Sequence, residues 1–180
     1  MFCFFRPLLP LLPLLCVLVG RAQPCNPPNF CGIVTGITLD RDVVALHGPG
    51  LFSDDLGHVG GRYYTDTTMS VTMIVSTGTD NYIEEVELRQ GLAFPKDAPK
   101  DLKPFVSRRL WRHDNGRLFR NGLGATREEI KTAYGAPTEA NDERSYWSYA
   151  SDPVGCLAFV ATTFVFTDDK VTSISFYNGD

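Results

Sequence analysis

The chain has 180 residues, of which 43% are hydrophobic, 21% charged and 12% aromatic, and its formal net charge is −4 at pH 7. These fractions are close to globular averages, so they exclude a largely disordered chain and a coiled coil. At about 100–200 residues per domain, the length fits one ordinary domain or two very small ones.

Residues 1–22 have the arrangement of a secretory signal peptide. Arg6 supplies a positive charge, residues 8–19 form an apolar run, and Gly20 and Ala22 are small residues suited to signal cleavage. The run is shorter than the about 20 apolar residues of a spanning helix, and prolines interrupt it. We therefore expect cleavage near Ala22 and a secreted or periplasmic mature chain with net charge −6 and no transmembrane segment.

Cysteine usage in the mature chain is consistent with an oxidising compartment, in which disulfides are stable. The three remaining cysteines are Cys25, Cys31 and Cys156, and an odd number leaves at least one of them over. Cys25 and Cys31 enclose the turn-rich sequence NPPNF and can form a local bridge. Either of them can instead pair with Cys156, or Cys156 can be a buried free thiol, and spacing alone does not decide.

An internal repeat organises the rest of the chain. Residues 79–91 (TDNYIEEVELRQG) and 167–179 (TDDKVTSISFYNG) match in their turn, apolar and glycine positions at an offset of 88. Further matches in the same order are Gly36 with Gly124 at that offset, and Tyr63-Tyr64 with Tyr146-Trp147 at an offset of 83. The ordered matches predict a duplication of one small unit.

The predicted organisation follows from this duplication. It comprises the signal peptide (1–22), a cysteine-containing amino-terminal segment (23–35), repeat 1 (36–91), a basic linker with a hairpin around Asp114-Asn115-Gly116 (92–121), and repeat 2 (122–180).

Each repeat is predicted to begin with a short helix. In repeat 1, Thr38 and Asp40 open the helix, and its apolar face contains Val43, Val44 and Leu46. In repeat 2, Thr126 caps the helix and Gly135 ends it, with the apolar residues Ile130, Ala133 and Tyr134 on one face.

Three strands are predicted after each helix, at residues 62–65, 69–76 and 83–88 in repeat 1 and at 144–150, 157–166 and 171–177 in repeat 2. The fold class is therefore α+β, with two tandem repeats that each contain a helical segment followed by a three-stranded antiparallel meander. We expect equal burial at the matched positions Ile83 and Val171, Val86 and Ile174, and Leu88 and Phe176.

Three short sequences resemble known bacterial secreted modules: Tyr134-Gly135-Ala136-Pro137, Trp147-x-Tyr149, and the run Phe-Thr-Asp-Asp-Lys-Val that begins at Phe166. The module is similar to that of the SmpA/OmlA outer-membrane-assembly lipoprotein family, which carries it once. It is also similar to the β-lactamase inhibitor protein family, which carries it twice in tandem. Leu15 before Cys16 departs from a lipoprotein signal, so the duplication favours the inhibitor-like architecture. The resemblance implies a non-enzymatic binding protein outside the cytoplasm.

Aromatic residues on the predicted strands are the first candidates for binding a partner protein: Tyr63, Tyr64, Tyr146, Trp147 and Tyr149. Tyrosine and tryptophan are enriched in interface hot spots. Strand alternation places Tyr146 on one face of its strand and Trp147 and Tyr149 on the other. One of these faces must lie in the core, and core packing is favoured for Trp147 and Tyr149.

The basic linker supplies the second group of partner-binding candidates. Residues 96–120 contain eight lysines and arginines against three aspartates, and the candidates among them are Arg108, Arg109, Trp111 and Arg112. This segment either lies across the acidic repeats of its own chain or contacts an acidic partner or an anionic envelope surface. Export argues against nucleic acid.

The sequence predicts no catalytic residue, metal site or cofactor. His58 lies near Asp54 and Asp55, but their spacing matches no zinc pattern. Cys156 lacks an identifiable base and orienting group. The glutamates at positions 84, 85 and 87 are typical of a solvated sheet face. We expect a non-enzymatic, inhibitor-like protein-binding protein; the alternatives are an envelope-associated structural or assembly factor and a hydrolase of unknown substrate.

Overall fold

A computed structural model of the chain describes residues 29–110, 122–141, 145–151 and 159–179. Its elements in chain order are β1 (Asn29–Phe30), β2 (Ile33–Val34), α1 (Asp40–His47), β3 (Leu51–Ser53), β4 (Gly61–Thr65), β5 (Val71–Thr77), β6 (Ile83–Gln90), α2 (Arg127–Tyr134), β7 (Glu139–Asn141), β8 (Tyr146–Ser151), β9 (Phe159–Thr167) and β10 (Lys170–Gly179). Among these elements, neither helix is long and apolar enough to cross a bilayer.

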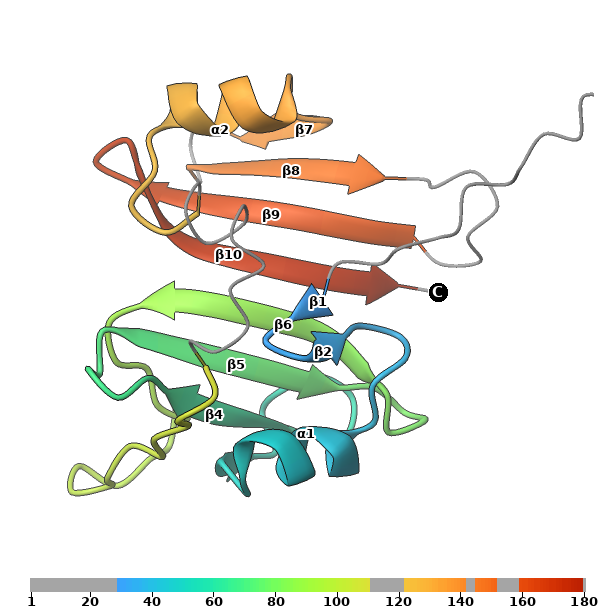
Figure 1. Cartoon of the computed structure of the whole chain (residues 1–180), viewed down its shortest axis with the longest axis vertical. Helices are drawn as coiled ribbons and strands as arrows, with labels where there is room; N and C mark the ends of the chain where they lie inside the picture. The colour runs from blue at the N-terminus through green and yellow to red at the C-terminus, as the bar shows by residue number, and fades with distance from the viewer. Residues whose placement is uncertain (1–28, 111–121, 142–144, 152–158, 180) are drawn as a thin grey trace, which may run out of the picture.

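The predicted fold class of two tandem helix-plus-three-strand repeats is wrong. Strands β3 to β10 form one eight-stranded antiparallel sheet in the order β3-β4-β5-β6-β10-β9-β8-β7, and β1 and β2 form a separate two-stranded sheet (Figure 1). The two parts of the chain share one sheet because β6 hydrogen-bonds to β10. This pairing removes an exposed edge from each part, and an unpaired edge is a site of unwanted association.

The junction between β6 and β10 is symmetric. Leu88 lies opposite Ile174, and Val86 lies opposite Phe176. At the offset of 88, Leu88 corresponds to Phe176 and Val86 corresponds to Ile174. The pair Leu88–Ile174 is therefore the equivalent of the pair Phe176–Val86, with the two parts of the chain exchanged. All four side chains are at most 2% exposed, as are Ile83 and Val171, which confirms the predicted equal burial.

Two edge strands were not predicted. β3 and β7 have three residues each and close the two ends of the sheet. A three-residue strand is too short to show the alternation of apolar and polar residues that identifies longer strands. The six predicted strands correspond to β4, β5, β6, β8, β9 and β10, with shifted ends.

The helices begin differently. At α2, the Thr126 hydroxyl accepts a hydrogen bond from the Glu129 amide (3.3 Å), and the Glu129 carboxylate accepts one from the Thr126 amide (2.8 Å), which is a capping box. The predicted role of Thr38 in opening α1 is wrong, because its hydroxyl accepts from the Val34 amide (2.9 Å) and the N-cap residue is Leu39. Thr38 thereby fixes the chain before the helix to β2.

One face of the sheet carries the hydrophobic core, and we call it the helix face. Cross-strand pairs align a row of residues on it: Tyr64, Met73, Leu88, Ile174, Phe164 and Trp147. Val43 of α1 and Ile130 of α2 are fully buried in this core, together with Phe30 and Ile33 of the small sheet. The two helices lie near opposite ends of the eight-stranded sheet (Figure 1).

The chain after β6 returns along the first half of the sheet. The Ala93 amide donates to the Thr72 hydroxyl (2.9 Å), which leaves Thr72 1% exposed on the face opposite the helices. Further on, the Thr65 amide donates to the Phe105 carbonyl, and the Ser107 amide donates to the Thr65 carbonyl, both at 2.8 Å. The predicted hairpin around Asn115 lies outside the described residues.

Candidate functional site

The face of the sheet opposite the helices is the first candidate surface. On its β6 and β8–β10 side it presents eight side chains that we call the open face: Glu85, Glu87, Tyr146, Ser148, Thr163, Val165, Ser175 and Tyr177. Direct cross-strand pairs place Glu87, Ser175, Thr163 and Ser148 in one row. These three hydroxyl-bearing residues are small, so the larger residues beside the row stand above it.

Exposure differs between the two halves of this side of the sheet. In the first half, Tyr63 is 8% exposed and Ile74 is 4% exposed. In the second half, Val165 is 36% exposed and Tyr177 is 40% exposed. This side of the sheet is therefore covered in its first half and accessible at Val165 and Tyr177 of the open face.

The centre of the open face is acidic and partly buried. The Arg89 guanidinium donates two hydrogen bonds to the Glu87 carboxylate, at 3.0 and 2.9 Å, and the Ser173 hydroxyl donates a third at 2.5 Å. Burial raises the pKa of Glu85 above its usual range, and a hydrogen bond from Ser175 opposes the shift. These glutamates are half-buried and hydrogen-bonded, so the prediction of a solvated sheet face is wrong for Glu85 and Glu87.

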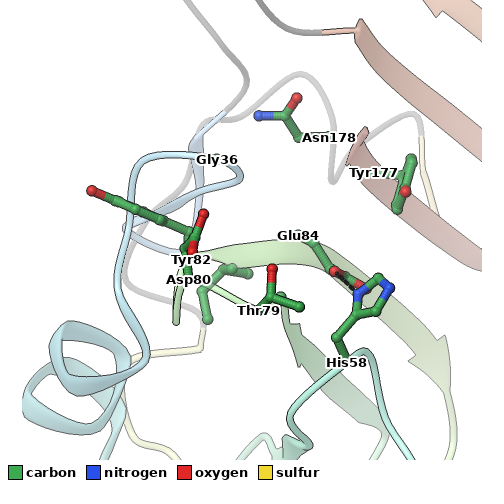
Figure 2. Close-up of a pocket in the computed structure, with 10 residues that line it drawn as sticks. Gly36, His58, Thr79, Asp80, Tyr82, Glu84, Tyr177 and Asn178 are labelled. Atoms are coloured by element: carbon green, nitrogen blue, oxygen red, sulfur yellow. Dashed lines mark hydrogen bonds and ion pairs between the residues drawn. The ribbon is translucent and has the colours of Figure 1, made fainter. Parts of the chain in front are cut away.

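A pocket of about 330 Å³ lies beside the open face, and Tyr177 belongs to both. Four parts of the chain line it: the loop after β2, the loop between β3 and β4, the turn between β5 and β6, and the end of β10 (Figure 2). The lining residues are Gly36, His58, Gly78, Thr79, Asp80, Tyr82, Ile83, Glu84, Tyr177 and Asn178.

A contact between a histidine and a carboxylate forms one wall of the pocket. Nδ1 of His58 lies 2.9 Å from Oε2 of Glu84, with the His58 side chain 64% exposed and the Glu84 side chain 19% exposed. His58 is near Asp54 and Asp55 in the sequence, but those aspartates line a different pocket, of about 390 Å³, between β3 and the linker. Within the described part of the chain, no group of three or more histidine, cysteine, aspartate or glutamate residues could hold a metal ion.

The opposite wall depends on a glycine. The Asn178 side-chain amide donates to the Thr35 carbonyl at 3.2 Å, which fixes the end of β10 to the loop after β2. A Cβ atom at Gly36 would lie 1.7 Å from Nδ2 of Asn178, and Gly36 has a φ of +74°. Any side chain at position 36 would therefore displace Asn178 and strain the backbone.

The predicted aromatic candidates separate into two groups. Tyr146 lies on the open face, and Tyr63 lies on the same side of the sheet near the linker. Trp147 and Tyr149 pack against the core, as favoured from alternation, and Tyr64 is 1% exposed within it.

The basic and cysteine candidates are only partly described. Arg108 and Arg109 are exposed in the turn before the buried Leu110, whereas Trp111 and Arg112 lie outside the described residues. Cys31 is a buried free thiol whose Sγ donates to the Leu110 carbonyl at 3.0 Å. Because Cys31 is free, the predicted bridges from Cys31 to Cys25 or to Cys156 are absent. Cys25 and Cys156 lie outside the described residues, so a disulfide between these two stays a prediction.

His47 is a buried polar residue that the sequence analysis missed. Its ring nitrogens lie 2.9 Å from the Ser107 hydroxyl and 2.9 Å from the Cys31 carbonyl, so it joins α1, the linker and the small sheet. Its position four residues after Val43 was the available signal, because residues four apart share one face of a helix.

Comparisons with known proteins identify a fold but no family. No protein-family model matches the chain, and no curated protein matches it. A crystal structure of a DUF4309 family protein (YjgB) from Bacillus subtilis subsp. subtilis strain 168 is similar to it, with a TM-score of 0.50 and 14% sequence identity, covering 85% of this chain and 86% of that chain. At this identity the similarity concerns the fold alone.

Proposed function

We propose that this chain is an exported, non-enzymatic protein that binds another protein through its open face. The observation that carries the proposal is the exposure of Val165 and Tyr177 beside a flat row of small hydroxyl residues, on the side of the sheet away from the core. The signal-peptide pattern of residues 1–22 supports action outside the cytoplasm.

The composition of the open face supports a protein partner. Tyr146 and Tyr177 offer large, rigid rings with a polar end, which is typical of interface hot spots. The half-buried carboxylate of Glu85 favours a partner that presents a lysine or arginine to the face, since complementary charges align interfaces, whereas the Glu87 carboxylate is already paired with Arg89. The resemblance to inhibitor-like modules points in the same direction.

A matched pair of substitutions tests this proposal. Val165→Arg places a large cation on the open face, and Val106→Arg makes the same change at a linker residue of similar exposure, 38%. The mature chain and both variants are immobilised and exposed to culture supernatant and to envelope extract. We expect a protein that the unmodified chain and Val106→Arg retain and Val165→Arg loses.

The fraction that supplies the partner distinguishes the two protein-binding roles. A soluble enzyme from the supernatant supports an inhibitor-like role, and an envelope protein supports an assembly role. Equal retention by both variants would contradict binding through the open face.

A further inference from the structure

The charged side chains that line the pocket in Figure 2 are mainly acidic. Among the residues that the structure describes, its lining contains the carboxylates of Asp80 and Glu84 and no lysine or arginine, and His58 is the single basic side chain. With His58 neutral, the pocket carries two negative charges; with His58 protonated, it carries one. An anionic ligand would therefore meet net repulsion in either state.

Glu84 is held in position rather than free in solvent. Its side chain is 19% exposed, and one of its two carboxylate oxygens is the contact of His58. Gly78 lets the carboxylate approach the β5–β6 turn, because a Cβ atom there would lie 2.9 Å from Oε2 of Glu84. A fixed, partly desolvated carboxylate attracts a cation more strongly than a fully exposed one.

One exposed aromatic side chain completes the pocket. Tyr177 is 40% exposed and contributes to the lining, whereas the ring of Tyr82 points away from the His58–Glu84 pair (Figure 2). Aromatic faces attract organic cations through the ring quadrupole. The combination of carboxylates with an exposed tyrosine ring suits a cation that also has an apolar chain.

The size and the donor set limit the ligand further. A volume of about 330 Å³ is at the lower end of small-molecule pockets, which span about 300–1,000 Å³. Asp80 and Glu84 do not belong to any described cluster that could hold a metal ion. An alkyl ammonium or guanidinium group fits both limits.

We infer that this pocket binds a guanidinium or ammonium group on a short alkyl chain, with Asp80 and Glu84 as its counter-ions and Tyr177 as its aromatic wall. The group comes either from a small molecule or from an arginine or lysine side chain of a protein. This site shares Tyr177 with the open face, but its carboxylates, Asp80 and Glu84, lie outside that face, so cation binding and capture of a partner can each fail without the other.

The test is an NMR titration of the ¹⁵N-labelled mature chain with N-acetyl-arginine methylamide. The matched control ligand is N-acetyl-citrulline methylamide, which has nearly the same shape and no charge. We expect saturable shifts of the Gly78, Tyr82 and Asn178 amides with the arginine compound only. Asp80→Asn and Glu84→Gln should each weaken binding by about fivefold, whereas Asp54→Asn, in the other pocket, should leave it unchanged.

Two further ligands identify the source of the cation. Tighter binding of the pentapeptide Gly-Gly-Arg-Gly-Gly than of butylguanidine indicates a protein side chain, and equal binding indicates a small molecule. The inference is overturned if the citrulline compound causes the same shifts, if no shift occurs, or if both pocket variants bind as the unmodified chain does. Val165→Arg should leave the titration unchanged, which separates this result from the test of the open face.

Discussion

Tyr149 makes in the second half of the sheet the contact that Tyr64 makes in the first. The Tyr64 hydroxyl donates to the carbonyl of Gly48, which ends α1, at 2.9 Å, and the Tyr149 hydroxyl donates to the carbonyl of Gly135, which ends α2, at 3.2 Å. The strand register also aligns these two tyrosines, since Tyr64 pairs with Met73 and Tyr149 with Thr162, the residues that face Leu88 and Phe176. The alignment of Tyr64 with Trp147 made from the sequence is therefore wrong by two residues.

Removing either hydroxyl should destabilise the protein. Tyr64→Phe should lower the free energy of unfolding by about 1 kcal/mol, and Tyr149→Phe by less, because Tyr64 is the more deeply buried and its hydrogen bond is the shorter. Urea denaturation monitored by circular dichroism measures both changes. Tyr82→Phe, at a residue 44% exposed, is the control and should change little. A larger loss at Tyr149 than at Tyr64 would contradict this ranking of the two hydrogen bonds.

Cys31 should be chemically inert in the folded protein. Burial raises the pKa of its thiol from the ordinary 9.0 to about 12, so at pH 8 about one thiol in ten thousand is ionised. We expect iodoacetamide to label Cys31 at least 100-fold more slowly in the folded chain than in urea, as measured by mass spectrometry of its peptide. Rapid labelling, or recovery of Cys31 in a disulfide, would contradict the buried free thiol.

The same burial sets a pH dependence of stability. The folded state keeps the Cys31 proton between pH 9 and about 12, whereas the unfolded state loses it. The unfolded state then binds fewer protons, so this contribution to stability is complete below pH 9 and decreases as the pH rises toward 12. Replacing Cys31 by alanine should make the slope shallower in urea denaturation between these pH values, at some cost in packing. Part of the slope should remain, because burial also raises the pKa of Tyr64 and Tyr134 above the ordinary 10.0. An unchanged slope would contradict the contribution of Cys31.

The continuous sheet predicts where backbone protection is highest. β6 and β10 lie in its centre and pair with each other, whereas β3 and β7 lie at its edges. Amide hydrogens of Leu88 and Ile174 should therefore exchange among the slowest in the protein, and those of β3 and β7 among the fastest of the strands. Amide exchange followed by NMR measures these rates. Fast exchange along both β6 and β10 would indicate two separate sheets.

Local sequence patterns predicted the elements better than their assembly. Val86 and Leu88 alternate with glutamates, so the β6 strand was visible, and Thr126 and Gly135 marked the ends of α2. The pairing of β6 with β10 was not visible, because the alternation in each strand specifies which face is apolar and leaves its neighbouring strand undetermined. The sheet that formed joins the two predicted repeats into one core.

The position of the pocket could not be predicted from the sequence either. A side-chain contact joins His58 to Glu84 across 26 positions of the chain, and the far wall comes from Asn178. Only the fold of the sheet brings these three residues together. His58 alone was noticed, and its nearest acidic residues in the sequence, Asp54 and Asp55, turned out to line another pocket.

Photo-crosslinking from the open face tests the central proposal most directly. A benzophenone amino acid replaces Val165 on the open face, Val106 on the linker, or Ala45 on the exposed side of α1, and the native cells are irradiated. We predict one covalent partner protein from position 165 and no such product from positions 106 and 45. The same product from all three positions, or a product from position 45 alone, would contradict capture of a partner by the open face.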